Sequence, residues 1–155
     1  RIHQLPKTPD SYGMIHANLH CGNVLIDSEN GAITLLGFEE CCYGWYVMDI
    51  AMSLFDLLVL YEGFNRDGFA QFFLPNFVTG YRSEFELNEF WLRQLVDFLK
   101  LLEVSIYLMV YDLYDPEDRE SWVGKFMPGR KIRIINNLPY VNIQIEELRL
   151  KPHRY

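Results

Sequence analysis

The chain has no long hydrophobic run, no excess of basic residues and little cysteine, and each absence excludes a class of protein. No apolar stretch reaches the roughly 18 residues that cross a bilayer, since Asp49 and Asp56 interrupt the longest candidate, 47–61. The net charge of −7 argues against nucleic-acid binding, because phosphates require a basic surface. Three cysteines without the spacing of a disulfide scaffold fit a reducing compartment. We therefore expect a cytoplasmic protein that binds neither membrane nor nucleic acid.

Glycine-rich phosphate-binding loops are also missing. Neither G-x-G-x-x-G nor G-x₄-G-K-[ST] occurs, and no lysine stands in a V-A-I-K context. The sequence therefore contains none of the common elements that clamp nucleotide phosphates.

The residues that are present can form one sizeable core. Half of the 155 residues are hydrophobic, and 11 Phe, 10 Tyr and 3 Trp supply large side chains for packing. We expect a single domain over residues 1–155.

Strand patterns come first along the chain, and helical patterns follow. Residues 24–26 and 32–36 read as short strands, and Asn30-Gly31 between them is a strong hairpin signal. A further short strand is expected at Met14-Ile15. Apolar periodicity then predicts four helices at 46–61, 67–82, 88–113 and 116–137, with the first buried beneath the hairpin. Pro128-Gly129 marks an expected break in the fourth. We expect the polar tail, 138–155, to pack loosely.

The most informative motifs lie between residues 14 and 49. Residues 15–23, IHANLHCGN, resemble the catalytic loop H-G-D-L-H-x-x-N of the aminoglycoside phosphotransferase and choline-kinase-like family. Residues 36–40, LGFEE, stand where that family has its metal-binding segment, I-D-F-D-D. The resemblance covers about residues 10–137. It implies an α+β, mainly α fold: a protein-kinase-like C-terminal lobe with a small β-hairpin and about four helices.

The resemblance also implies an activity and its cofactors. Family members transfer a phosphoryl group from ATP, with Mg²⁺, to a hydroxyl of an aminoglycoside, amino alcohol or sugar-like acceptor. A small cationic or hydroxylated acceptor suits the negative charge of this chain. The family clamps ATP with an N-terminal lobe whose motifs are absent here. We therefore expect an N-terminal lobe or a partner chain elsewhere, or else a truncated remnant.

Two acids of the family motif are replaced in this chain. Asn18 stands at the position of the catalytic Asp, and an amide cannot accept the proton of the acceptor hydroxyl. Loss of a positioned general base costs roughly 100- to 10,000-fold in rate. Gly37 stands at the position of the metal-binding Asp and has no side chain. We expect weak or absent binding of Mg²⁺ and ATP.

Other motif positions are retained. Asn23 matches the family's metal-binding Asn, and Glu39 is a possible surrogate ligand, because on a strand it would share a side with Gly37. His16 begins the loop, and the resemblance implies that it belongs to the catalytic site and packs or hydrogen-bonds beneath the loop. Asp49 matches an Asp that accepts hydrogen bonds from the loop backbone, so we expect it to be buried there.

These observations leave two functions open. The chain is either a small-molecule kinase lobe that is inactive as written, or a catalytically dead binding or scaffold module. Glu39 and Glu40 could equally form a solvated acidic loop, and Asn18 could simply cap a loop. A zinc site formed by His16, His20 and the cysteines is disfavoured, because the spacing lacks C-x₂₋₄-C pairs.

Overall fold

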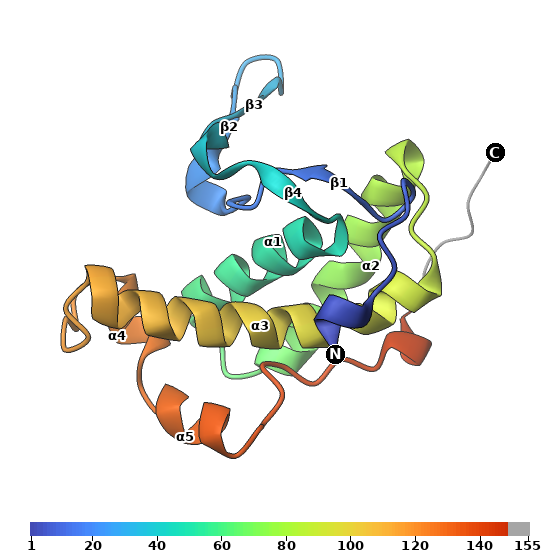
Figure 1. Cartoon of the computed structure of the whole chain (residues 1–155). Helices are drawn as coiled ribbons and strands as arrows, with labels where there is room; N and C mark the ends of the chain where they lie inside the picture. The colour runs from blue at the N-terminus through green and yellow to red at the C-terminus, as the bar shows by residue number, and fades with distance from the viewer. Residues whose placement is uncertain (149–155) are drawn as a thin grey trace.

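The structure, a computed structural model, describes residues 1–148 and is mainly helical. Four short strands form two antiparallel pairs on one side of the helices (Figure 1). β1 (Tyr12–Ile15) pairs with β4 (Cys42–Trp45), and β2 (Val24–Ile26) pairs with β3 (Ile33–Leu35). The expected hairpin is therefore confirmed, whereas β4 was not predicted.

Five helices make up the rest of the body. Their bounds are α1, Val47–Leu60; α2, Arg66–Glu84; α3, Glu89–Leu113; α4, Trp122–Phe126; and α5, Arg130–Ile135. Single 3-10 turns lie at η1 (Ile2–Gln4), η2 (Cys21–Asn23), η3 (Phe38–Glu40) and η4 (Ile145–Glu147). The first three helices begin and end within a few residues of the predicted positions.

The core lies where α1 crosses α3 (Figure 1). The apolar residues of α1 recur every three or four positions, so one broad face of this helix is buried against its neighbours. Asparagine side chains cap the next two helices: Asn65 accepts from Gly68 N–H, and Asn88 accepts from Trp91 N–H. These local signals explain why the helix starts could be predicted from sequence.

The predicted helix over 116–137 is wrong. Asp115 accepts a hydrogen bond from Glu117 N–H at 2.9 Å, and Asp118 accepts one from Glu120 N–H at 2.9 Å. These aspartate turns offer the backbone an alternative to the helix. Gly129, at φ 71°, separates α4 from α5, which confirms the break expected at Pro128-Gly129. The segment consists of a turn and two short helices.

The position of the hairpin also differs from the prediction. β2 and β3 project from the helical body, and Leu25, Ile26 and Ile33 are more than half exposed (Figure 1). β4 and η2 contact α1 instead. The pair formed by β1 and β4 is therefore the layer that joins the hairpin to the core.

The expectation of a loosely packed tail is wrong for residues 138–148. Tyr140 and Val141 are buried, and the Tyr140 ring stacks on Phe55 of α1 with 4.4 Å between ring centroids. Apolar side chains spaced too irregularly to indicate a helix nevertheless complete the core here. Residues 149–155 lie outside the described part of the chain. Within residues 1–148, no helix is long and apolar enough to cross a membrane.

A buried ion pair joins α3 to α5 beside this segment. Arg130 Nη1 donates to Glu103 Oε1 at 2.6 Å, and both side chains are at most 4% exposed. The Arg130 guanidinium also lies over the Tyr140 ring, 5.0 Å from its centroid. Glu103 Oε2 has no hydrogen-bond partner among the described residues. The pair thus fixes α5 and the 138–148 segment against α3.

Candidate active site

The loop of residues 16–23 is tied to the first turn of α1 by Asp49. The two carboxylate oxygens of Asp49 accept hydrogen bonds from the backbone N–H groups of His16 and Ala17, each at 2.8 Å. The sequence predicts that Asp49 accepts hydrogen bonds from the loop backbone, and these two bonds are present. The side chain is half-buried rather than fully buried. Asp49 thus fixes the backbone at the start of the loop.

Two further residues of α1 hold the rest of the loop. Ser53 Oγ donates to the Leu19 carbonyl at 3.3 Å, and Cys21 N–H donates to Asp56 Oδ2 at 3.0 Å. Asp49, Ser53 and Asp56 are spaced i, i+4 and i+7, so they lie on one face of the helix. Sequence reasoning missed Ser53 and Asp56. Their signal was a polar stripe on an otherwise apolar helix.

Cys21 is not activated by this arrangement. Burial raises the pKa of its thiol, and the hydrogen bond to Asp56 and the negative charge of Asp56 raise it further. The thiol therefore stays protonated near neutral pH, and thiolate is the nucleophilic form of cysteine.

His16 is buried beneath the loop, and the backbone occupies both of its ring nitrogens. Nε2 lies 2.8 Å from the Leu36 carbonyl, and Nδ1 lies 3.2 Å from Asn18 N–H. A proton on Nε2 satisfies both contacts, because Nδ1 is then the acceptor. The His16 ring also lies 4.8 Å from the Phe38 ring. His16 is therefore suited to holding the loop rather than to exchanging protons.

Ala17 adopts a left-handed backbone conformation, with φ at 62°. The related family has Gly at this position of its loop pattern. A Cβ in the left-handed region costs about 1–2 kcal/mol, whereas Gly adopts this conformation freely. The loop therefore adopts a conformation that favours Gly at this position, at the cost of local strain.

Replacing Ala17 with Gly should raise the free energy of unfolding by about 1 kcal/mol, because the strain is removed. Urea denaturation followed by circular dichroism measures this change. Ala32→Gly is the matched control: Ala32 is exposed and has no positive φ, so its replacement should not stabilise the chain. Equal effects of the two changes would contradict the strain at Ala17.

The fold brings Asn18, Asn23 and Gly37 together. Asn23 Nδ2 donates to the Asn18 carbonyl at 2.9 Å, and Leu36 N–H donates to the Asn23 carbonyl at 2.9 Å. Gly37 has φ 77°, and a Cβ placed there would clash with the Asn23 amide. The positions that the sequence assigned to base and metal therefore adjoin one another.

The backbone at Glu39 and Glu40 differs from the strand that the surrogate role of Glu39 assumed. Both are exposed, and they lie in the 3-10 turn η3 rather than on a strand. The argument that Glu39 shares a side with Gly37 assumed strand alternation, so it does not apply to this backbone.

The residues at the loop do not fit a magnesium site. Mg²⁺ is usually held in proteins by one or two carboxylates together with substrate phosphates. Only the Asn23 amide oxygen stands at an expected ligand position, because Gly37 has no side chain. Within residues 1–148, no three His, Cys, Asp or Glu side chains are placed to hold a metal ion. The zinc set of histidines and cysteines is likewise not assembled there.

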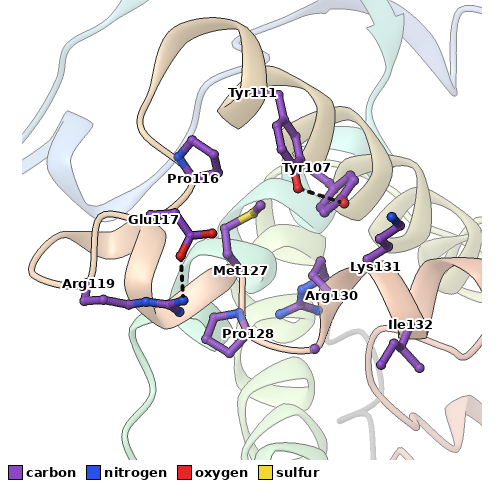
Figure 2. A pocket seen from close by; sticks show the side chains of 11 residues that line it. Tyr107, Tyr111, Pro116, Glu117, Arg119, Met127, Pro128, Arg130, Lys131 and Ile132 are labelled. Atoms are coloured by element: carbon purple, nitrogen blue, oxygen red, sulfur yellow. Dashed lines mark hydrogen bonds and ion pairs between the residues drawn. The ribbon is translucent and has the colours of Figure 1, made fainter.

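A pocket of about 340 Å³ lies elsewhere, between α3, the turn after it, and the connection from α4 into α5 (Figure 2). Tyr107 and Tyr111 face it with their hydroxyls 3.2 Å apart, and Glu117 pairs with Arg119 at 3.1 Å. None of the predicted site residues lines this pocket. It is therefore separate from the loop of residues 16–23.

Comparisons with known proteins confirm the resemblance that the loop motif indicates. A family model described as the phosphotransferase enzyme family matches residues 2–89. The amicoumacin kinase of Bacillus subtilis (strain 168) is 36% identical, and the alignment covers 79% of this chain and 38% of that protein.

Two solved structures are also similar. An amicoumacin kinase in complex with AMP-PNP, Ca²⁺ and Ami has a TM-score of 0.82 at 29% identity, covering 94% of this chain and 44% of that chain. A microcompartment-associated aminopropanol kinase has a TM-score of 0.61 at 26% identity. The match covers 85% of this chain and 40% of that chain. The expected kinase-like, mainly helical fold is thus confirmed. The chain spans less than half the length of these relatives.

Proposed function

The chain belongs to the phosphotransferase enzyme family, and from this premise we propose that it is the catalytic-loop lobe of a small-molecule kinase. The proposed reaction moves the γ-phosphate of ATP to a hydroxyl of an aminoglycoside, amino alcohol or sugar-like acceptor. Relatives described as amicoumacin kinase and aminopropanol kinase support this class of acceptor. The observation that carries the proposal is the loop of residues 16–23, held on Asp49 as a phosphotransferase loop requires.

An ATP-clamping lobe or partner chain is part of the proposal. Phosphoryl transfer needs groups that cradle the β- and γ-phosphates, and this sequence has no glycine-rich loop to do so. The relatives are more than twice as long as the region they share with this chain, which leaves room for such a lobe in them. We place the protein in the cytoplasm.

We further propose that the chain as written does not catalyse the transfer. As the acceptor oxygen bonds to the γ-phosphorus and the bond to the leaving ADP breaks, the hydroxyl proton must pass to a base. The family uses a loop Asp for this step, and the Asn18 amide cannot take the proton. Gly37 also removes a carboxylate from the position of the metal ligand.

A binding or scaffold module is the second candidate. It is favoured by the contrast between the loop backbone and the reactive positions. Asp49, Ser53 and Asp56 all bond the loop, whereas Asn18 and Gly37 both lack the acid that chemistry needs. A chain that only binds a ligand would need the ordered loop backbone but not the acids at positions 18 and 37.

Turnover of the purified chain tests the proposed inactivity. With Mg²⁺-ATP and a panel of amino alcohols and aminoglycosides, we expect no phosphate transfer above the uncatalysed background. Calorimetric titration of Mg²⁺-ATP should show no binding tighter than the millimolar range, about −4 kcal/mol. The change Asn18→Asp with Gly37→Asp should strengthen metal binding, once the Asn23 amide rotates away from position 37.

The two candidates are then distinguished by what restores activity. Turnover by the double variant when an ATP-clamping lobe is supplied supports the kinase origin, and acceptor binding without turnover supports the binding module. Robust Mg²⁺-dependent transfer by the unmodified chain would overturn the proposed inactivity. In that case Glu39→Gln and Glu40→Gln would identify the working acid.

A further inference from the structure

A second pocket, of about 450 Å³, lies where the start of α1 meets the end of α2. Tyr46 precedes the first residue of α1, and Tyr81, Glu84 and Phe85 come from the last turn of α2 and the residue after it. None of these four residues forms one of the hydrogen bonds that hold the loop of residues 16–23 to α1. The pocket therefore adjoins the start of α1, where Asp49 N–H donates to the Tyr46 carbonyl at 3.2 Å, but its lining residues make none of the contacts that hold the loop.

The aromatic rings of this pocket meet at nearly right angles. The Phe85 ring makes an angle of 79° with Tyr46 and 84° with Tyr81, at centroid separations of 5.2 and 6.3 Å. Phe85 thus packs edge-to-face against both tyrosines, and because all three rings line the pocket, one small group there can contact more than one ring. A cation is attracted to the negative face of an aromatic ring within about 6 Å of its centroid. This geometry suits an alkylated ammonium group.

The hydroxyl group of Tyr46 is held by a hydrogen bond, whereas that of Tyr81 is not. Tyr46 Oη donates to the Pro9 carbonyl at 3.2 Å, which holds that ring in place. The Tyr81 hydroxyl forms no hydrogen bond to any described residue, and its ring is half-buried. The aromatic walls are thus in position without a ligand.

Negative charge lies beside the same pocket. The Glu84 carboxylate lines it, and the carbonyl end of the 19-residue helix α2 carries partial negative charge there. Burial and the charge of Asp49 both raise the pKa of the Tyr81 phenol, so a negative potential reaches this ring. The adjacent cation, Arg82, does not line the pocket, and its Nε donates to the Leu87 carbonyl at 2.8 Å. Anions are therefore disfavoured as ligands.

We propose that Tyr46, Tyr81, Phe85 and Glu84 form a binding site for a small organic ammonium ion. The rings supply cation–π contacts to the ammonium charge and apolar surface for its alkyl groups. Glu84 supplies the opposite charge. This site is independent of the proposed phosphotransferase function, because it uses none of the residues of the catalytic-type loop.

Titration of the ¹⁵N-labelled chain with tetramethylammonium chloride, followed by NMR, tests the proposal. We expect saturable shifts of the amides of Tyr46, Tyr81 and Phe85, with a dissociation constant in the millimolar range or below. Sodium chloride at equal ionic strength is the first control. Choline compared with 3,3-dimethylbutan-1-ol, its neutral isostere, isolates the charge: the neutral compound should bind about tenfold more weakly.

Variants of the chain locate the site. Tyr81→Leu should weaken tetramethylammonium binding about tenfold, and Glu84→Gln should weaken it several-fold without affecting the fold, since Glu84 is exposed. Tyr111→Leu, which removes an exposed tyrosine outside the pocket, should leave binding unchanged. Equal binding of the neutral isostere, no effect of Glu84→Gln, or no saturable shifts at all would each overturn the proposal.

Discussion

Replacing Glu103 with Ala should lower the free energy of unfolding by about 3–5 kcal/mol. The change leaves the guanidinium of Arg130, whose side chain is only 4% exposed, without its carboxylate partner. A buried charge that has lost its partner costs much more than the pair contributed, because water cannot replace the lost contact. Urea denaturation followed by circular dichroism and by tryptophan fluorescence measures the loss.

Two further variants separate the buried pair from general effects of charge. Glu117→Ala removes a carboxylate from the exposed pair with Arg119 and should leave stability unchanged within error. Replacing both Glu103 and Arg130 by Met should recover most of the loss, since neither charge then remains buried. A change of less than 1 kcal/mol for Glu103→Ala would contradict the buried pair. The same variant should also loosen Tyr140, whose ring lies against Arg130.

Replacing Asp49 with Ala should destabilise the chain by about 1–3 kcal/mol and loosen the loop of residues 16–23. Two backbone donors, the N–H groups of His16 and Ala17, lose their acceptors together. Hydrogen exchange followed by NMR should show that these two amides lose protection, while amides at the centre of α3 keep theirs.

Asp56→Ala is the matched control, because Asp56 accepts one hydrogen bond from the loop backbone, at a more exposed site. It should cost less than Asp49→Ala and should expose Cys21 N–H alone. Unchanged protection of His16 and Ala17 in Asp49→Ala would show that another group holds the loop.

The parts of the fold that sequence could predict are those set by local signals. Asn30-Gly31 specified the hairpin turn, and Gly31 has the positive φ, 73°, that this turn requires. The period of apolar residues specified α1 and α3. The helix expected to start at 116 does not form, because the Asp115 and Asp118 carboxylates accept hydrogen bonds from nearby backbone N–H groups and stabilise turns. Asp is common both at helix starts and in turns, so the sequence signal at this point is ambiguous.

The contributions of distant residues could not be predicted. β4 exists because it pairs with β1, some thirty positions earlier, and its own pattern is too short to indicate a strand. In the candidate site, Asp49 was predictable from its spacing to the family loop motif. The burial of Tyr140 and the meeting of Tyr46 with Phe85 depend on helix packing, which no local pattern specifies.

The Asn23 amide fills the space that a side chain at position 37 would need, so the effect of a mutation at either position depends on the residue at the other. A side chain introduced at 37 begins where the Asn23 amide now lies, and that amide is itself hydrogen-bonded to the Asn18 carbonyl. A substitution at 37 is therefore costly while Asn23 keeps this rotamer and cheaper after position 23 has changed. The two sites are epistatic, with effects that do not add. Any mutational path that returns an acid to position 37 is consequently constrained in the order of its steps.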